Sequence, residues 1–119
     1  MKSILILESS ESVAKLCADI FDKRGWAVTA CEDRDDALER LTSESSYKVI
    51  LLGYSVPGAN GVQLVRFIRG LKHRRMAAVV MVTDRVEIIE EALSAGANEV
   101  LLDPINPGVM VSLVDRHFS

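Results

Sequence analysis

Polar side chains follow four of the short apolar runs in this sequence, and they are the residues best placed to do chemistry. These positions are Glu8-Ser9-Ser10, Gly53-Tyr54-Ser55, Thr83-Asp84 and Asp103-Pro104. Carboxylates can bind a cation or attack an electrophile, and hydroxyls can accept a group when a base activates them. Two interpretations of the acids follow: Glu8, Asp84 and Asp103 form a cation site, or they are solvated acids at strand ends.

The hydroxyl and thiol groups predict less chemistry than the acids. Four hydroxyls stand near these strand ends: Ser9, Ser10, Tyr54 and Ser55. An alcohol is a poor nucleophile without a general base, and both histidines, His73 and His117, fall outside the strand ends. Cys17 and Cys31 lie inside apolar patterns, without a CxxC or Cys/His cluster. We therefore expect both cysteines to be packed as small hydrophobic residues, with no zinc site.

The elements that must position these groups alternate regularly along the chain. The expected strands are residues 4–7, 26–31, 49–52, 77–82 and 100–102, with 26–31 near a sheet edge. The expected helices run from Ser9 or Ser10 to Gly25, over 35–41, over 64–71, over 86–95, and from Asn106-Pro107 onward. Strands alternating with helices predict right-handed βαβ units and a parallel sheet covered on both faces. We expect an α/β fold, a flavodoxin-like, doubly wound (βα)5 arrangement with strand order 2-1-3-4-5.

Length and composition limit what the chain can be. Its 119 residues are 49% hydrophobic and 26% charged, which predicts a single globular domain over 1–119. The net charge of −3 argues against direct nucleic-acid binding. No apolar run approaches the roughly 20 residues of a membrane helix, so no membrane contact is expected. Two cysteines are too few for a disulfide framework, which favours a cytoplasmic location.

Over essentially its whole length, the sequence resembles the receiver domain of bacterial two-component response regulators. The segment 49–61 (VILLGYSVPGANG) is similar to that family's third strand and following loop. Thr83 ends the fourth expected strand as the family's threonine or serine does, and 92–97 (ALSAGA) resembles the fourth-helix exit. Asp103-Pro104 stands where the family has a lysine–proline pair, whose peptide bond is often cis. The resemblance implies a role in phosphorelay signal transduction.

The sequence departs from the family at three positions that carry its chemistry. The family's phosphoacceptor aspartate stands four residues before the loop proline, and this position is Gly53 here. The family's first-strand acidic pair aligns with Glu8 and Ser9, so one carboxylate is lost, and the family's lysine aligns with Asp103. The resemblance therefore implies that the nucleophile and the cation are missing and that the metal site has lost one of its carboxylates. We expect no cofactor and no metal site, the Mg²⁺ site of the family being lost or weak.

The family's switch residues are also incomplete. Thr83 is expected to satisfy a nearby backbone group instead of reaching for a phosphoryl group. The family's switching aromatic residue aligns with Val100, which has no polar tip. We therefore expect a degenerate receiver (a pseudo-receiver), not an enzyme, that acts as a protein–protein interaction module. The alternative is a phosphorylatable response regulator with a displaced acceptor; a flavodoxin-type cofactor protein is disfavoured because Glu8-Ser9-Ser10-Glu11 contains no glycine.

The last expected helix is apolar on more than one side, which indicates a docking face. Its apolar residues are Val109, Met110, Val111, Leu113, Val114 and Phe118. In the family, the fourth helix, fifth strand and fifth helix form the usual dimer and output face. We expect a protein partner or self-association there, through Val109, Ser112, Leu113 and Arg116, with Val100 nearby.

A second surface is basic. Between Tyr54 and Thr83 there is no acidic residue, while the segment carries Arg66, Arg69, Lys72, Arg74 and Arg75. This cluster either docks an acidic partner or is a solvated helix face.

Overall fold

The sheet has the predicted order. The computed structural model describes residues 2–31 and 33–118. Its five parallel strands lie in the order β2-β1-β3-β6-β7, which is 2-1-3-4-5 when these five are counted along the chain. The strands are β1 (Ser3–Leu7), β2 (Ala27–Cys31), β3 (Val49–Gly53), β6 (Ala78–Thr83) and β7 (Glu99–Leu102). The three central strands are buried at every residue, because both faces of a parallel sheet are covered by helices.

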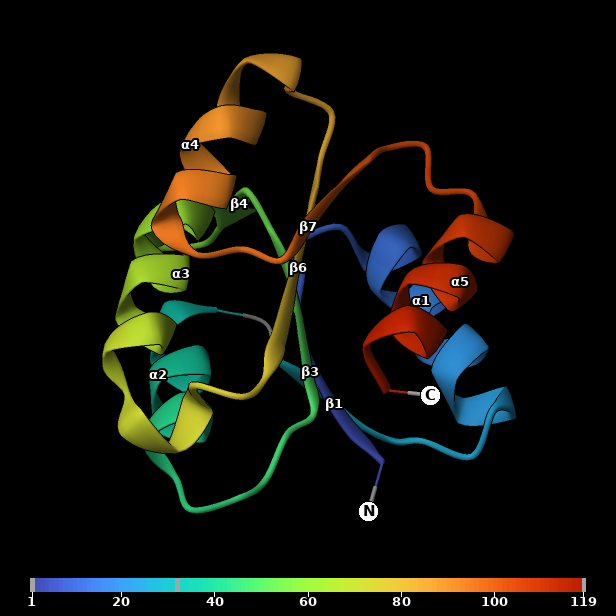
Figure 1. Cartoon of the computed structure of the whole chain (residues 1–119), viewed down its shortest axis with the longest axis horizontal. Helices are drawn as coiled ribbons and strands as arrows, with labels where there is room; N and C mark the ends of the chain where they lie inside the picture. Colours follow the sequence, from blue (N-terminus) through green and yellow to red (C-terminus); the bar gives the residue numbers. More distant parts are fainter. Residues whose placement is uncertain (1, 32, 119) are drawn as a thin grey trace.

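The helices form two layers. Figure 1 shows α1 (Glu11–Lys23) and α5 (Pro107–Phe118) on one face of the sheet. The other face carries α2 (Arg34–Thr42), α3 (Gly61–Gly70) and α4 (Ile89–Ala95). Successive side chains of β1 point to opposite faces of the sheet. Ile4 and Ile6 pack toward α1 and α5, and Leu5 and Leu7 pack toward α2, α3 and α4. This period of two fixes which side chains can reach either layer.

Local signals in the sequence set most of the helix starts. Ser10 caps α1 by accepting from the backbone N–H of Val13, and the Asn106 side chain accepts from the N–H of Gly108 at 2.9 Å. Two segments differ from expectation. The expected helix 86–95 is a 3-10 turn, η2 (Val86–Ile88), followed by α4. The expected loop after Gly53 contains a small antiparallel hairpin, β4 (Ser55–Val56) with β5 (Ala59–Asn60).

Two residues of the predicted basic surface are structural instead. Arg74, in the 3-10 turn η1 (Lys72–Arg74), is 2% exposed. Its guanidinium donates to four carbonyl oxygens at the end of α2 and just beyond, those of Arg40, Leu41, Ser43 and Ser45. Arg69 donates to the carbonyls of Gly96 and Ala77 and to the side chain of Asn98. Both prefer these sites because each guanidinium satisfies carbonyls that the ends of helices and strands leave unpaired. Arg66, Lys72 and Arg75 remain exposed.

The expectation that Leu113 takes part in the docking face is wrong, because Leu113 is buried. Leu113 is 6% exposed and packs with Met110 and Val114 in the core under α5. Positions 110, 113 and 114 lie on one stripe of a helix, so this stripe faces the sheet and Val109 is left outside, 48% exposed. Ser112 and Arg116 are exposed as expected. The side chain of Phe118 lies outside the described part of the chain.

None of the helices in the described residues is long and apolar enough to span a membrane.

Candidate functional site

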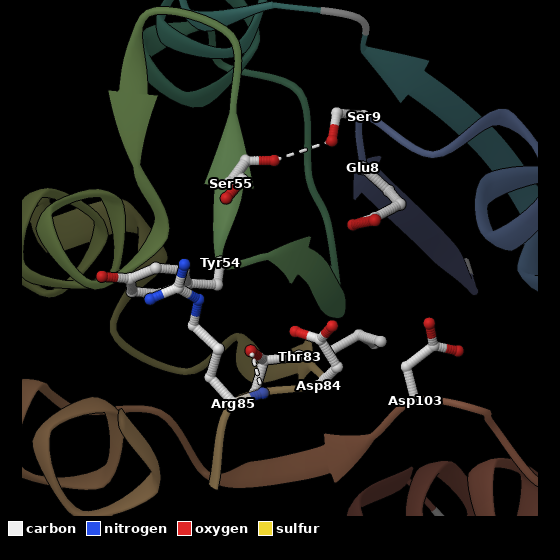
Figure 2. Close-up of a pocket in the computed structure, with 9 residues that line it drawn as sticks. Glu8, Ser9, Tyr54, Ser55, Thr83, Asp84, Arg85 and Asp103 are labelled. Atoms are coloured by element: carbon white, nitrogen blue, oxygen red, sulfur yellow. Dashed lines mark hydrogen bonds between the residues drawn. The ribbon is translucent and has the colours of Figure 1, made fainter. Parts of the chain in front are cut away.

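The polar residues singled out in the sequence meet in one pocket. All five strands of the sheet are parallel, so their carboxyl ends lie at one edge, and β1 and β3 flank the point where the strand order reverses. A pocket of about 180 Å³ opens there. Its lining residues are Glu8, Ser9, Tyr54, Ser55, Val82, Thr83, Asp84, Arg85 and Asp103 (Figure 2). The residues at these strand ends therefore lie together, while Ser10 caps α1 and does not line the pocket.

Gly53 leaves a space that Glu8 fills. A Cβ atom added at Gly53 would lie 1.9 Å from Oε2 of Glu8 and 2.8 Å from its Cδ. No unbonded pair of heavy atoms tolerates such a distance, so any side chain at position 53 must displace the Glu8 carboxyl group. The space beside Gly53, at the end of β3, is thus occupied by the acid that follows β1. Figure 2 shows the Glu8 side chain extending into the pocket.

The Glu8 carboxyl group sits in an environment that disfavours its charge. Oε2 is buried and has no hydrogen-bond partner in the described chain. Burial raises the pKa of Glu8 from 4.5 to about 6, a hydrogen bond from the backbone of Ser10 lowers it in part, and the Asp103 carboxylate raises it further. Glu8 therefore takes up a proton at a higher pH than an ordinary glutamate does.

Two of the pocket hydroxyls, those of Ser9 and Thr83, form hydrogen bonds within the chain. Ser9 Oγ donates to the carbonyl of Ser55 at 2.9 Å, which ties the end of β1 to the hairpin. Thr83 Oγ1 accepts from the backbone N–H of Arg85 at 3.0 Å, as expected from the sequence. Both bonds are drawn in Figure 2.

Arg85 is a pocket residue that the sequence analysis missed. Its guanidinium lies 5.4 Å from the centre of the Tyr54 ring, a cation–π geometry, and 3.9 Å from a carboxylate oxygen of Glu87. In Figure 2 the guanidinium lies over Tyr54 and not beside Glu8. Arg85 is the one cation among the lining residues. The sequence held one signal for this residue. An arginine stands two residues after Thr83, and the residue after Gly53 is the aromatic Tyr54.

The pocket acids do not form a metal-binding group among the described residues. No group of three or more His, Cys, Asp or Glu side chains within the described residues is placed to share a metal ion. The cation site suggested for Glu8, Asp84 and Asp103 is therefore not formed. A divalent ion such as Mg²⁺ takes a near-octahedral set of oxygen ligands, and the described residues offer no group of three acids for it.

Val100 and Asp103, the remaining positions of the expected site, lie on β7 and just after it. Val100 is half-buried on β7, next to Met81 of β6, and offers only methyl groups. Asp103 follows β7, and its peptide bond to Pro104 is cis.

Comparisons with known proteins agree with this geometry. The family model described as "Response regulator receiver domain" matches residues 4–115. The chain is 26% identical over 115 residues to the phosphate regulon transcriptional regulatory protein PhoB of Escherichia coli, which covers 95% of this chain and 50% of PhoB. It is 25% identical over 111 residues to the chemotaxis protein CheY1 of Helicobacter pylori, covering 90% and 89% of the two chains. The chain thus spans about half the length of PhoB and most of CheY1.

Solved structures share the fold. A putative response regulator from Chloroflexus aurantiacus superposes with a TM-score of 0.90 at 20% identity, covering 98% of this chain and 96% of that one. The chemotaxis response regulator CheY4 of Vibrio cholerae gives 0.90 at 22% identity, with 99% of both chains covered. With the family model matched over nearly all of its length, the chain belongs to the response regulator receiver domains of two-component signalling.

Proposed function

We propose that this receiver domain does not accept a phosphoryl group at the usual position and acts as a protein-interaction module. The observation that supports this most is the pair Gly53 and Glu8. Glycine has no oxygen that could attack phosphorus, and the Glu8 carboxyl group occupies the space where an acceptor side chain would begin.

The charges of the pocket support the same proposal. Glu8, Asp84 and Asp103 line the pocket, against Arg85 alone, whose guanidinium is stacked on Tyr54. Like charges a few ångströms apart repel by roughly 1 to 4 kcal/mol in environments between bulk water and a protein surface. A phosphate dianion entering this pocket meets repulsion at the position where the family supplies a lysine.

The proposed docking face lies on α4, β7 and α5. Three apolar side chains are exposed there: Leu93 at 46%, Leu102 at 44% and Val109 at 48%. Ser112 and Arg116 extend it along α5, and Arg116 Nη1 lies 3.1 Å from Oε1 of Glu99. Leu113 is no longer part of this face because it is buried. Exposed apolar residues rimmed by polar ones are typical of contact surfaces, either for a signalling partner or for a second copy.

Incubation with acetyl phosphate and Mg²⁺, followed by intact-mass measurement, tests the proposal. The expected result is an unchanged mass for this chain, while a receiver domain that keeps its third-strand aspartate gains one phosphoryl group under the same conditions. A stoichiometric, acid-labile adduct on this chain contradicts the proposal.

One observation favours a second candidate, a regulator with a displaced acceptor. The carboxyl group of Glu8 lies in the acceptor's place, so Glu8 is the residue that would carry the phosphoryl group. Under this alternative, the adduct maps to Glu8 and disappears in Glu8→Gln. The repulsion from Asp103, which also raises the pKa of Glu8, makes this the weaker candidate.

A further inference from the structure

A groove at the opposite end of the sheet from the Glu8 pocket has the composition of a ligand site. It has a volume of about 510 Å³ and lies between the edge strand β2, the end of α2 and the loop that leads into β3. That loop is at the lower end of the molecule in Figure 1, where the strands begin. The residues that matter here are Thr29, Arg40, Ser45, Ser46, Tyr47 and Lys48.

The groove presents hydrogen-bond donors that the described chain does not use. The side-chain hydroxyls of Thr29, Ser45, Ser46 and Tyr47 make no hydrogen bond within the described residues, and the ammonium group of Lys48 makes no ion pair there. Ser45 and Ser46 are held in place through their backbone carbonyls, which accept from Arg74 and from Ser3 Oγ. The backbone of both serines is therefore fixed beside the groove, and their hydroxyls are free to donate.

The two charged residues that line the groove are both cations. Lys48 and Arg40 line it, and Arg40 shares its charge with Asp36 through one 3.4 Å contact. Behind the ring of Tyr47 lies the buried Arg74 guanidinium, 4.9 Å from the ring centre. Arg74 is bonded to carbonyl oxygens and, among the described residues, pairs with no carboxylate. Asp36, Glu44 of the same loop and about half a charge at the carboxyl end of α2 offset part of this positive charge. Lys48 has no ion pair among the described residues and therefore supplies the counter-charge beside the hydroxyls.

We propose that this groove binds an oxyanion of the phosphate class, either inorganic phosphate or the phosphate group of a monoester. Lys48 and Arg40 supply the counter-charge, and the hydroxyls of Thr29, Ser46 and Tyr47 donate to the remaining oxygens. Binding involves no group transfer. The site lies at the amino ends of the strands, so it is separate from the Glu8 pocket and does not depend on the function proposed for that pocket.

The experiment is an amide NMR titration of the whole chain with sodium phosphate, matched at every point by sodium chloride of equal ionic strength. Saturable shifts are expected for Thr29 and for residues 45–48 with phosphate and not with chloride. Lys48→Gln is expected to weaken binding about tenfold, since a hydrogen bond to a charged group is worth roughly 1.5 kcal/mol or more. Tyr47→Phe keeps the ring over Arg74 and removes only the hydroxyl, so a smaller loss is expected. Lys15→Gln, an exposed lysine of α1, is the matched control and leaves the affinity unchanged.

Parallel titrations with phosphoserine and adenosine monophosphate distinguish the sources of the phosphate group. Tighter binding of one of them than of inorganic phosphate assigns the ligand to that monoester, and equal affinities assign it to phosphate itself. The proposal is overturned by equal shifts with chloride, by shifts that do not saturate, or by affinities that neither Lys48→Gln nor Arg40→Gln changes in folded protein. Phosphate-specific shifts at Gly53 and Thr83 alone would contradict both this proposal and the function proposed above, whereas shifts at neither site overturn this one only.

Discussion

Replacing Glu8 by glutamine should stabilise the fold at neutral pH and remove part of its pH dependence. The pKa of Glu8 is raised from 4.5 to about 6, chiefly by burial. A shift of this size corresponds to about 2 kcal/mol, and since Glu8 is only partly buried, solvent screening reduces the expected effect to roughly 1 kcal/mol.

The direction follows from which state binds the proton more tightly. A raised pKa in the folded state means that the folded protein binds the Glu8 proton better than the unfolded chain does. This contribution to stability is fully present below pH 4.5 and is lost as the pH rises through about 6. Glutamine resembles the protonated acid at every pH. Glu8→Gln should therefore match the wild type below pH 4.5 and be more stable than it by about 1 kcal/mol above pH 6.

Urea unfolding of both proteins across this pH range measures the difference. Glu44→Gln, which removes an exposed acid from the loop between α2 and β3, is the control for the loss of one negative charge. The reasoning is refuted if Glu8→Gln is no more stable than the wild type above pH 6, if the difference is the same at both ends of the range, or if Glu44→Gln reproduces it.

Three further predictions follow from the packing. Gly53→Asp alone should not make the chain accept a phosphoryl group from acetyl phosphate, because the new side chain would overlap the Glu8 carboxyl group. Intact-mass measurement checks this. Stoichiometric phosphorylation of the single variant would show that the Glu8 side chain moves aside freely. Val109→Glu should weaken self-association or partner binding without lowering the urea midpoint of unfolding, since Val109 is exposed. Sedimentation of the wild type and the variant measures the association. Unchanged association would show that Val109 is not part of the docking face. Arg74→Met should lower the free energy of unfolding by about 3 kcal/mol, because it leaves buried carbonyls at the end of α2 without donors. Lys72→Met, a change at an exposed residue of the same turn, should lower it little. Equal losses in urea unfolding of both variants would contradict the structural role given to Arg74.

The arrangement of elements was predictable because it depends on local signals and on chain topology. Continuous apolar runs such as Ile4–Leu7 mark strands covered on both faces, and the capping residues Ser10 and Asn106 mark helix starts. Alternation of strands and helices leaves few possible sheet orders. The convergence of Glu8, Thr83 and Asp103 then follows, because parallel strands end at one edge.

The errors arise where a side chain's direction decides its role. Leu113 and Val109 are both apolar residues of α5, and only the rotation of the helix against the sheet separates the buried one from the exposed one. The sequence shows Arg74 beside other cations, but not that the end of α2 approaches it with unpaired carbonyls. These contacts join segments more than 25 residues apart, and no local pattern records them.

The contact between Glu8 and Gly53 was the feature of the site that could least be predicted from the sequence. The sequence indicates a missing acid at position 53 and a remaining acid at position 8. It does not indicate that the second fills the space left by the first, because this depends on how closely β1 and β3 lie and on the rotamer of Glu8. A glycine that accommodates a neighbour's carboxyl group is a specific packing arrangement and not merely the loss of a nucleophile.

The most direct test of the account is whether the pocket at the carboxyl ends of the strands can hold a phosphoryl-like group. Beryllofluoride with Mg²⁺, added to saturation and followed through the amide signals of Gly53, Thr83 and Asp103, measures this. The account predicts no saturable shift at these three amides, because the Glu8 carboxyl group fills the space beside Gly53 and Asp103 opposes an incoming anion. Saturable shifts at Gly53 and Thr83 that require both Mg²⁺ and beryllofluoride would contradict it.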